Sequence, residues 1–305
     1  MELTWPIKLR IAAAAAVGIG LIGVLAWPMV APAESFGVVS FISGTISAGD
    51  VIVMLVLAFV AGLVSYFLSW PYGSRIGILA VPAGLGVWAV RTGDMGTLMQ
   101  LNTPIVRREQ IFSTLCAESL LWLAIVAAGF FGVFVASCII HPAAPVTRMA
   151  GKPQKRGISV IVNAVAAVIC SAVVAQFLIG IFARDFTISD GTSGAAVAQP
   201  ATSQIVFAVV TAFIAAGFLV KKVLDGDYLW PIISSCLVTP FAVSVYGKRS
   251  ALEYFAGRWP AVFFPSSVLA VLPIQVVAFG AIGAVSGYWL AVYYDYWRQY
   301  GTSGD

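Results

Sequence analysis

Charge is scarce in this sequence. Of its 305 residues, 17 are lysine or arginine and 13 are aspartate or glutamate, so charged residues make up 10% of the chain. Soluble globular proteins carry about 25%, and a chain this poor in charge cannot cover a water-facing surface. Hydrophobic residues make up 60% of the chain, and the mean hydropathy is +0.97. The composition therefore excludes an ordinary soluble fold and indicates an integral membrane protein.

Side chains that commonly carry out catalysis are also few. The chain has one histidine, His141, and four cysteines that form no CxxC pair. A lone histidine without a cluster of cysteines or carboxylates cannot build a zinc site, and no acid–base pair stands out. The GxGxxG pattern at Gly18–Gly23 lies inside an apolar run, where small residues favour helix packing over dinucleotide binding. We therefore expect no enzymatic activity, no metal and no cofactor.

Long apolar runs are abundant. A helix needs about 20 apolar residues to cross a bilayer, and runs without period-two alternation favour helices over a β-barrel. The sequence predicts an all-α integral membrane protein with about eight transmembrane helices: Ile11–Trp27, Val51–Trp70, Ile76–Val90, Leu120–Ile140, Ile158–Ala183, Ile205–Val220, Leu229–Tyr246 and Pro273–Tyr294. A re-entrant Leu229–Tyr246 is the alternative, which would leave seven spans. The amphipathic loops Thr103–Glu118 and Arg249–Trp259 are predicted to form interfacial helices.

Lysine and arginine in the short loops predict the orientation. Lys8 and Arg10 precede the first span, four basic residues lie at positions 148–156, and Lys221 and Lys222 follow the sixth span. With eight spans, all of these residues and both termini lie in the cytoplasm. The Ala-, Gly- and Val-rich composition favours a bacterial cytoplasmic (inner) membrane, with lipid as a partner. The net charge of +4 is too scattered for nucleic acid.

The two halves of the chain resemble each other in sequence. Four short matches keep the same order at offsets of 154–158 residues: LIGVLA at Leu21 and LIGIFA at Leu178, AFVAG at Ala58 and AFIAAG at Ala212, LAVP ending at Pro82 and LVTP ending at Pro240, GVFVA from Gly132 and GYWLA from Gly287. The sequence therefore predicts a 4+4 tandem repeat with halves 1–147 and 148–305. An even number of spans in each half gives both halves the same orientation in the membrane.

Small residues at helical spacing predict close helix packing. Gly283 and Gly287 form a GxxxG pattern in the eighth span, and Ala128 and Gly132 lie at the matching places of the fourth. Such spacing lets two helix backbones approach each other within a bilayer. The partner helix can belong to this chain or to another one.

Two prolines define the candidate binding site. Pro82 interrupts the third span and Pro240 the seventh, and Thr239, Asn163 and Gln176 are the further polar candidates. A proline inside a helix frees a backbone carbonyl, and broken helices at corresponding places of two repeats often mark a transporter's site. The alternative is an ordinary kink, with the two amides forming interhelical hydrogen bonds.

Two functions remain open from the sequence. The lack of charge within the spans and the small-residue patterns favour a non-enzymatic accessory or scaffold subunit of a membrane assembly, with other membrane subunits or a homo-oligomer as partners. The alternative is a transporter or channel for a neutral or apolar small molecule, with a site between the third and seventh spans.

Overall fold

Eight helices in the computed structural model are long and apolar enough to cross a membrane, as the sequence predicts. The structure describes residues 5–32, 34, 37–41, 46–140, 157–190 and 194–300. The spans are α1 (Trp5–Gly18) with the π-helix η1 (Ile19–Leu25), α3 (Ala48–Leu68), α4 (Gly73–Ile76) with η3 (Gly77–Leu79) and α5 (Ala80–Arg91), α7 (Ile105–Ile140), α8 (Gly157–Phe182), α9 (Thr202–Leu224), α10 (Leu229–Tyr246) and α12 (Pro273–Tyr300).

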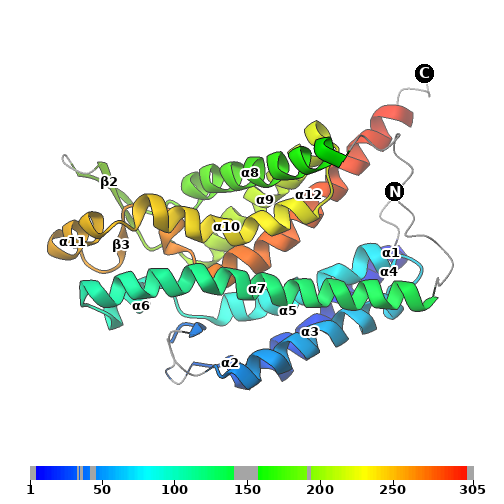
Figure 1. Ribbon diagram of the computed structural model, residues 1–305, viewed down its shortest axis with the longest axis horizontal. Helices are drawn as coiled ribbons and strands as arrows, with labels where there is room; N and C mark the ends of the chain where they lie inside the picture. The colour runs from blue at the N-terminus through cyan, green and yellow to red at the C-terminus, as the bar shows by residue number, and fades with distance from the viewer. Residues whose placement is uncertain are drawn as a thin grey trace.

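Short elements connect the spans. They are α2 (Trp27–Val30), α6 (Met95–Leu101), α11 (Arg249–Arg258) and the 3-10 helix η4 (Ser267–Ala270). The predicted interfacial helix at Arg249–Trp259 is present as α11, whose buried Leu252 and Phe255 face the rest of the protein. α11 lies at the end of the bundle opposite to the start of α1 and the end of α12 (Figure 1).

The fourth span is longer than the sequence indicates. The expected interfacial helix Thr103–Glu118 and the expected span Leu120–Ile140 form one continuous helix, α7, of 36 residues. No proline lies within it, and its first glycine is Gly129, so nothing in the sequence breaks the helix between the two expected segments. At about 1.5 Å per residue it is roughly 54 Å long. Its first part must project beyond a hydrocarbon core of about 30 Å.

A small antiparallel sheet follows α8, and the sequence analysis did not predict it. Strands β1 (Thr187–Asp190) and β2 (Gly194–Ala198) form a hairpin, and β3 (Phe263–Phe264) pairs with the end of β2. Ala198 pairs with Phe263, so the sheet ties the loop after α8 to the segment before α12. This sheet and α11 lie together at one end of the bundle (Figure 1).

The spanning helices form two groups that follow the chain order. α1, α3, α5 and α7 pack together, as do α8, α9, α10 and α12, and the two groups lie one above the other in Figure 1. Contacts between the groups run from α5 to α12, from α7 to α10 and from α7 to α12. The boundary expected at residues 147 and 148 lies outside the described residues.

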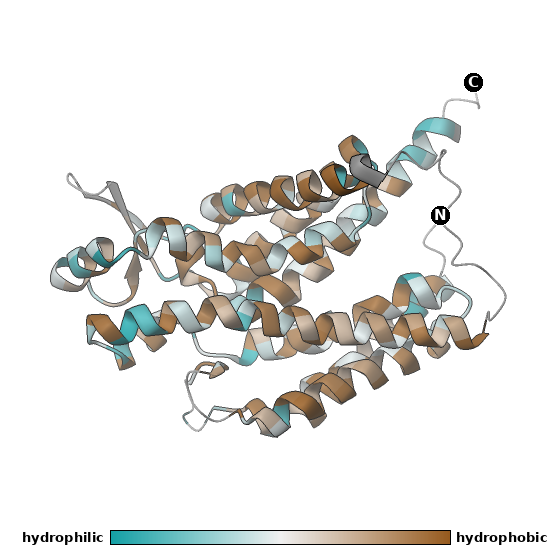
Figure 2. Ribbon diagram, in the orientation of Figure 1, coloured by the Kyte–Doolittle hydropathy of each residue, from teal (hydrophilic) through white to brown (hydrophobic). Residues whose placement is uncertain are grey.

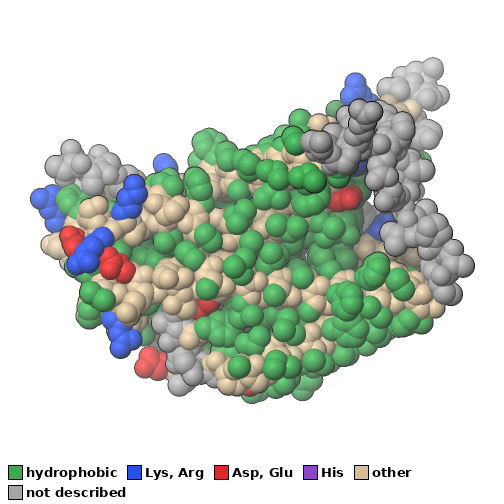
Figure 3. Space-filling view, viewed as in Figure 1, with side chains coloured by type: hydrophobic (Ala, Val, Ile, Leu, Met, Phe, Trp, Pro, Cys, Tyr) green, Lys and Arg blue, Asp and Glu red, His purple; other side chains and the backbone are tan. Residues whose placement is uncertain are grey.

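Apolar side chains cover the sides of the bundle. Figure 2 shows hydrophobic residues along the outward faces of the helices, and Figure 3 shows charged side chains gathered towards the ends. On α8 one stripe of large apolar side chains is more than half exposed, namely Ile161, Val165, Ile169, Val173 and Phe177. A soluble protein would bury such a stripe, so the surface fits a multi-pass membrane protein.

Candidate functional site

Pro82 directly follows a change of helix type within the third span. The third span is already divided into α4, η3 and α5, and Pro82 is the third residue of α5. The first N–H groups of a helix have no partner within it, so the missing N–H of Pro82 removes no hydrogen bond inside α5. In the preceding 3-10 turn, the Ser65 hydroxyl of α3 donates to the Gly77 carbonyl at 3.1 Å. The break is therefore supported by a neighbouring helix.

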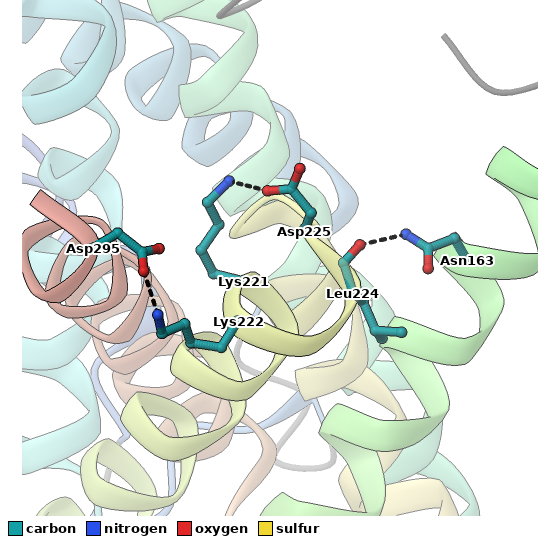
Figure 4. Close-up of polar contacts among 6 residues, drawn as sticks. All are labelled: Asn163, Lys221, Lys222, Leu224, Asp225 and Asp295. Carbon is teal, nitrogen blue, oxygen red and sulfur yellow. Dashed lines mark hydrogen bonds and ion pairs between the residues drawn. The ribbon is translucent and has the colours of Figure 1, made fainter. Parts of the chain in front are cut away.

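Pro240 lies inside α10, as the sequence predicts, with Thr239 buried beside it. The Gln176 amide on α8 donates to the Val238 carbonyl at 2.5 Å. A second amide on α8, that of Asn163, donates to the Leu224 carbonyl at the end of α9 at 2.8 Å (Figure 4). Both amides thus form hydrogen bonds between helices.

The helices that carry the two prolines, α5 and α10, each pack mainly against other helices. α5 packs mainly against α12, η1 and α1, whereas α10 packs mainly against α8, α7 and α12. α7 and α12 each contact both helices. The sequence-based expectation of a shared cavity between the third and seventh spans assumed that corresponding helices face each other across the symmetry axis. Helix α7 of one group instead contacts helix α10 of the other.

The glycines of the eighth span lie against α9 of the same chain. A Cβ at Gly283 would lie 2.6 Å from the Val210 carbonyl oxygen, and one at Gly287 would collide with the Ile214 carbonyl. Only a glycine permits backbones this close. The sequence analysis had left open whether the partner helix belongs to this chain.

The fourth span makes the same kind of contact with α3. A Cβ at Gly132 would collide with the Phe59 carbonyl, and Ala128 packs partly buried against the core. Sequence analysis missed the glycines on the opposite sides of these crossings, Gly62 and Gly217. A signal existed, because each of them closes one of the repeated AFVAG and AFIAAG motifs.

A polar and aromatic cluster lies where α9 and α12 end (Figure 4). Lys222 pairs with Asp295 of α12, and Lys221 pairs with Asp225 at 2.5 Å. Lys222 also lies over the Tyr294 ring, at 4.5 Å from its centroid. These ion pairs are partly exposed, so each contributes little to stability, about 0–1 kcal/mol. The Lys222–Asp295 pair joins the end of α9 to α12, whereas the Lys221–Asp225 pair lies within the end of α9.

Tyr228 extends this cluster towards the other helix group. Its ring lies 5.4 Å from that of Tyr288 on α12 and 6.5 Å from that of Phe130 on α7. Burial raises the pKa of Tyr228 to about 12, and the nearby Asp227 carboxylate acts in the same direction. A neutral phenol at pH 7 is a packing and hydrogen-bonding group rather than a base.

Two buried charged residues at the opposite end were missed by sequence reasoning. The Glu118 carboxylate accepts hydrogen bonds from the Ser40 hydroxyl at 2.5 Å and from the Phe41 N–H at 2.7 Å. The Arg108 guanidinium donates to the carbonyls of Met99 and Asn102, at 3.2 and 3.1 Å. Both residues fasten connecting segments onto α7. Both lie within the segment Thr103–Glu118, which was expected to be a separate helix at the membrane surface, and this concealed their burial.

A small cavity lies beside Arg108. It has a volume of about 20 Å³, which is enough for roughly one water molecule. Its walls are mostly apolar: Met99, Phe112, Leu252, Phe255 and Phe264. It lies under α11, and the prolines and amides of the predicted site are not among its lining residues.

Within the described part of the chain, no three His, Cys, Asp or Glu side chains lie close enough together to hold a metal ion. His141 lies outside the described residues. Comparison of the chain with family models, with curated proteins and with solved structures gave no significant match.

Proposed function

We propose that the protein is a non-enzymatic accessory or scaffold subunit of a membrane assembly. The observation that carries this proposal is the internal use of its polar side chains. Gln176, Asn163 and Gln275 each donate to a backbone carbonyl of a neighbouring helix. Solute pathways are lined by polar or ionisable side chains that remain available to the solute. Here these groups join helices to one another, which is the role expected in a packed structural bundle.

The transporter alternative receives no support from the helix packing. A site between the third and seventh spans requires α5 and α10 to line a common space, whereas α5 packs mainly on α12 and η1, and α10 packs mainly on α8 and α7. The cavity under α11 has room for about one water molecule. No observation on the described residues therefore favours a second candidate function.

The outward faces of the bundle are available to membrane partners. α8 packs on α9 and α10 with one side, and its other side carries the exposed apolar stripe from Ile161 to Phe177. α3 likewise exposes Ile52 and Val56. In a scaffold subunit, at least one such face contacts another protein instead of lipid.

Site-specific photocrosslinking in native membranes tests the proposal. A crosslinking amino acid at Val173 on α8 or Val56 on α3 should yield a discrete protein adduct from at least one of these faces. The control position is the fully buried Ala175 on α8, which should crosslink only within the chain. Lipid adducts alone at both exposed positions, together with migration as a lone chain in mild detergent, would refute the scaffold proposal.

We also propose a bacterial cytoplasmic membrane with both termini in the cytoplasm. α1 begins and α12 ends at the same end of the bundle (Figure 1), and Lys8, Arg10 and Lys222 belong to this end, which fits the positive-inside rule. Basic residues at the opposite end are partly neutralised, since Arg249 pairs with Glu253 at 2.9 Å and with Glu109 at 3.8 Å. The nearby carboxylates raise the pKa of Arg249.

A further inference from the structure

The helix crossing of α3 with α7 is matched by that of α9 with α12. In the first, Cβ atoms at Gly62 and Gly132 would collide with the carbonyls of Gly129 and Phe59, respectively. In the second, Cβ atoms at Gly217 and Gly287 would meet the carbonyls of Ala284 and Ile214. Each residue of the first crossing precedes its counterpart by 155 positions: Phe59 and Ile214, Gly62 and Gly217, Gly129 and Ala284, Gly132 and Gly287.

A second pair of crossings matches at another offset. A Cβ at Gly18 on α1 would collide with the Ala80 carbonyl on α5. In the second half, Gln176 on α8 donates to the Val238 carbonyl on α10. Gly18 and Gln176 are 158 residues apart, as are Ala80 and Val238. The change from 158 to 155 between the two sets of crossings corresponds to loops of different length. The LIGVLA and LIGIFA motifs of the same spans match at 157, and the one-residue difference falls between Gly18 and Leu21, where the π-helix η1 begins.

Contacts between the two helix groups are reciprocal. The third span of the first group, α5, packs on the last span of the second, α12, and the third span of the second group, α10, packs on the last span of the first, α7. α7 and α12 also contact each other. An interface in which element i contacts j and j contacts i is the signature of a two-fold axis. The axis would pass between α7 and α12.

We infer that the chain is two copies of one four-helix unit, joined in parallel as a pseudo-two-fold dimer. The interface consists of α5 and α7 of one unit and α10 and α12 of the other, so each unit's partner is a second copy of itself. This inference does not depend on the scaffold role.

Distances between spin labels in the full chain test the symmetry. Ile52 and Phe207 are counterparts at offset 155, as are Cys138 and Tyr293, and all four side chains are exposed. A two-fold axis requires the distance from 52 to 293 to equal the distance from 207 to 138. Cys116, Cys170 and Cys236 are replaced in every variant. Cys138 is kept and labelled only for the pairs that include it, and is replaced in the others, so that each variant carries two labels. Pulsed electron paramagnetic resonance then measures both distances in reconstituted bilayers.

The two pairs within single units serve as the matched control. If the units share one fold, the distance from 52 to 138 equals that from 207 to 293. We expect equality for both comparisons. Unequal distances within the units would overturn the duplication. Equal distances within the units but unequal distances across them would overturn the two-fold axis. Each labelled variant must elute from size exclusion like the wild type, which the exposed positions favour.

Discussion

A methyl group added at Gly217 tests the close crossing of α9 and α12. A Cβ there would lie 2.5 Å from the Ala284 carbonyl oxygen and 3.2 Å from the carbonyl carbon and Cα of the same residue. Ordinary contact for a Cβ begins at 3.4 Å. The backbones must therefore separate by the difference, about 0.9 Å, in Gly217→Ala. No flexible side chain can move instead, because all three obstructing atoms belong to the backbone.

The loss of stability in Gly217→Ala depends on how extensive the contact between α9 and α12 is. α9 and α12 share the most extensive contact between any two helices in the described ranges. Overpacking of a well-packed core costs about 1–3 kcal/mol, while alanine is favoured over glycine inside a helix by about 0.5–1 kcal/mol. Because only backbone atoms obstruct the methyl group, we place the overpacking cost in the upper part of this range, at about 2–3 kcal/mol. Gly217→Ala should then lose about 1–2.5 kcal/mol of net stability, which corresponds to a Tm lower by roughly 2–10 °C.

Fluorescence-detected size exclusion after heating in detergent measures this loss. The matched control is Gly180→Ala on α8, where a Cβ meets only a Val268 methyl at 4.0 Å; its Tm should equal or exceed that of the wild type. Gly62→Ala, the counterpart in the first half, should be at least as harmful as Gly217→Ala. A wild-type Tm for Gly217→Ala would refute the close crossing of α9 with α12.

Three further predictions concern topology, an interhelical hydrogen bond and a buried phenol. Single cysteines at Glu2 and Ser303 should both be labelled only from the cytoplasmic side; labelling of position 303 only from outside would mean seven spans. Gln176→Leu removes the hydrogen bond to the Val238 carbonyl and should cost about 0.6–1.7 kcal/mol, and an unchanged Tm would contradict that bond. The raised pKa of Tyr228, about 12 against an ordinary 10.0, means that the unfolded chain ionises this phenol first. The stabilising effect of the neutral, buried phenol is complete below pH 10 and is lost as the pH rises towards 12. The wild type should therefore lose stability over this interval faster than Tyr228→Phe. Parallel stability profiles of the two proteins would contradict the burial of Tyr228.

The membrane spans could be predicted because the bilayer itself dictates their length and composition. All eight expected runs correspond to helices, and α10 has the bounds expected from the sequence, Leu229–Tyr246. The predicted boundary between Thr103–Glu118 and the fourth span was wrong, because the sequence contains no residue there that ends a helix. α7 continues through Glu118 since neither a proline nor a glycine ends it there. Strand β2 is built largely from glycine and alanine, which have little β-propensity, so its pairing partners decide its conformation.

The candidate site was harder to predict, because proximity between distant helices leaves no mark on local sequence. Pro82 and Pro240 could be identified as corresponding positions, but the sequence could not show that α5 packs mainly on α12 and η1, and α10 mainly on α8 and α7. The glycine pattern predicted only part of the packing of the eighth span. Gly283 and Gly287 indicated a close approach, whereas the identity of the approaching helix, α9, required the structure.

The scarcity of charge also determines how this bundle can specify one arrangement. Lipid tails are as apolar as leucine side chains, so burial of apolar surface does not select which helices meet. The pairing of helices is therefore determined by the few positions where two helix backbones touch or where a side-chain amide donates a hydrogen bond to a neighbouring helix. At the crossing of the first and third spans, Gly18 permits close approach to Ala80; at the corresponding crossing in the second half, Gln176 bonds to Val238. Enlarging such a position by one methyl group should therefore harm the fold more than exchanging a whole side chain on the outward face of α8, which contacts no other helix of the chain.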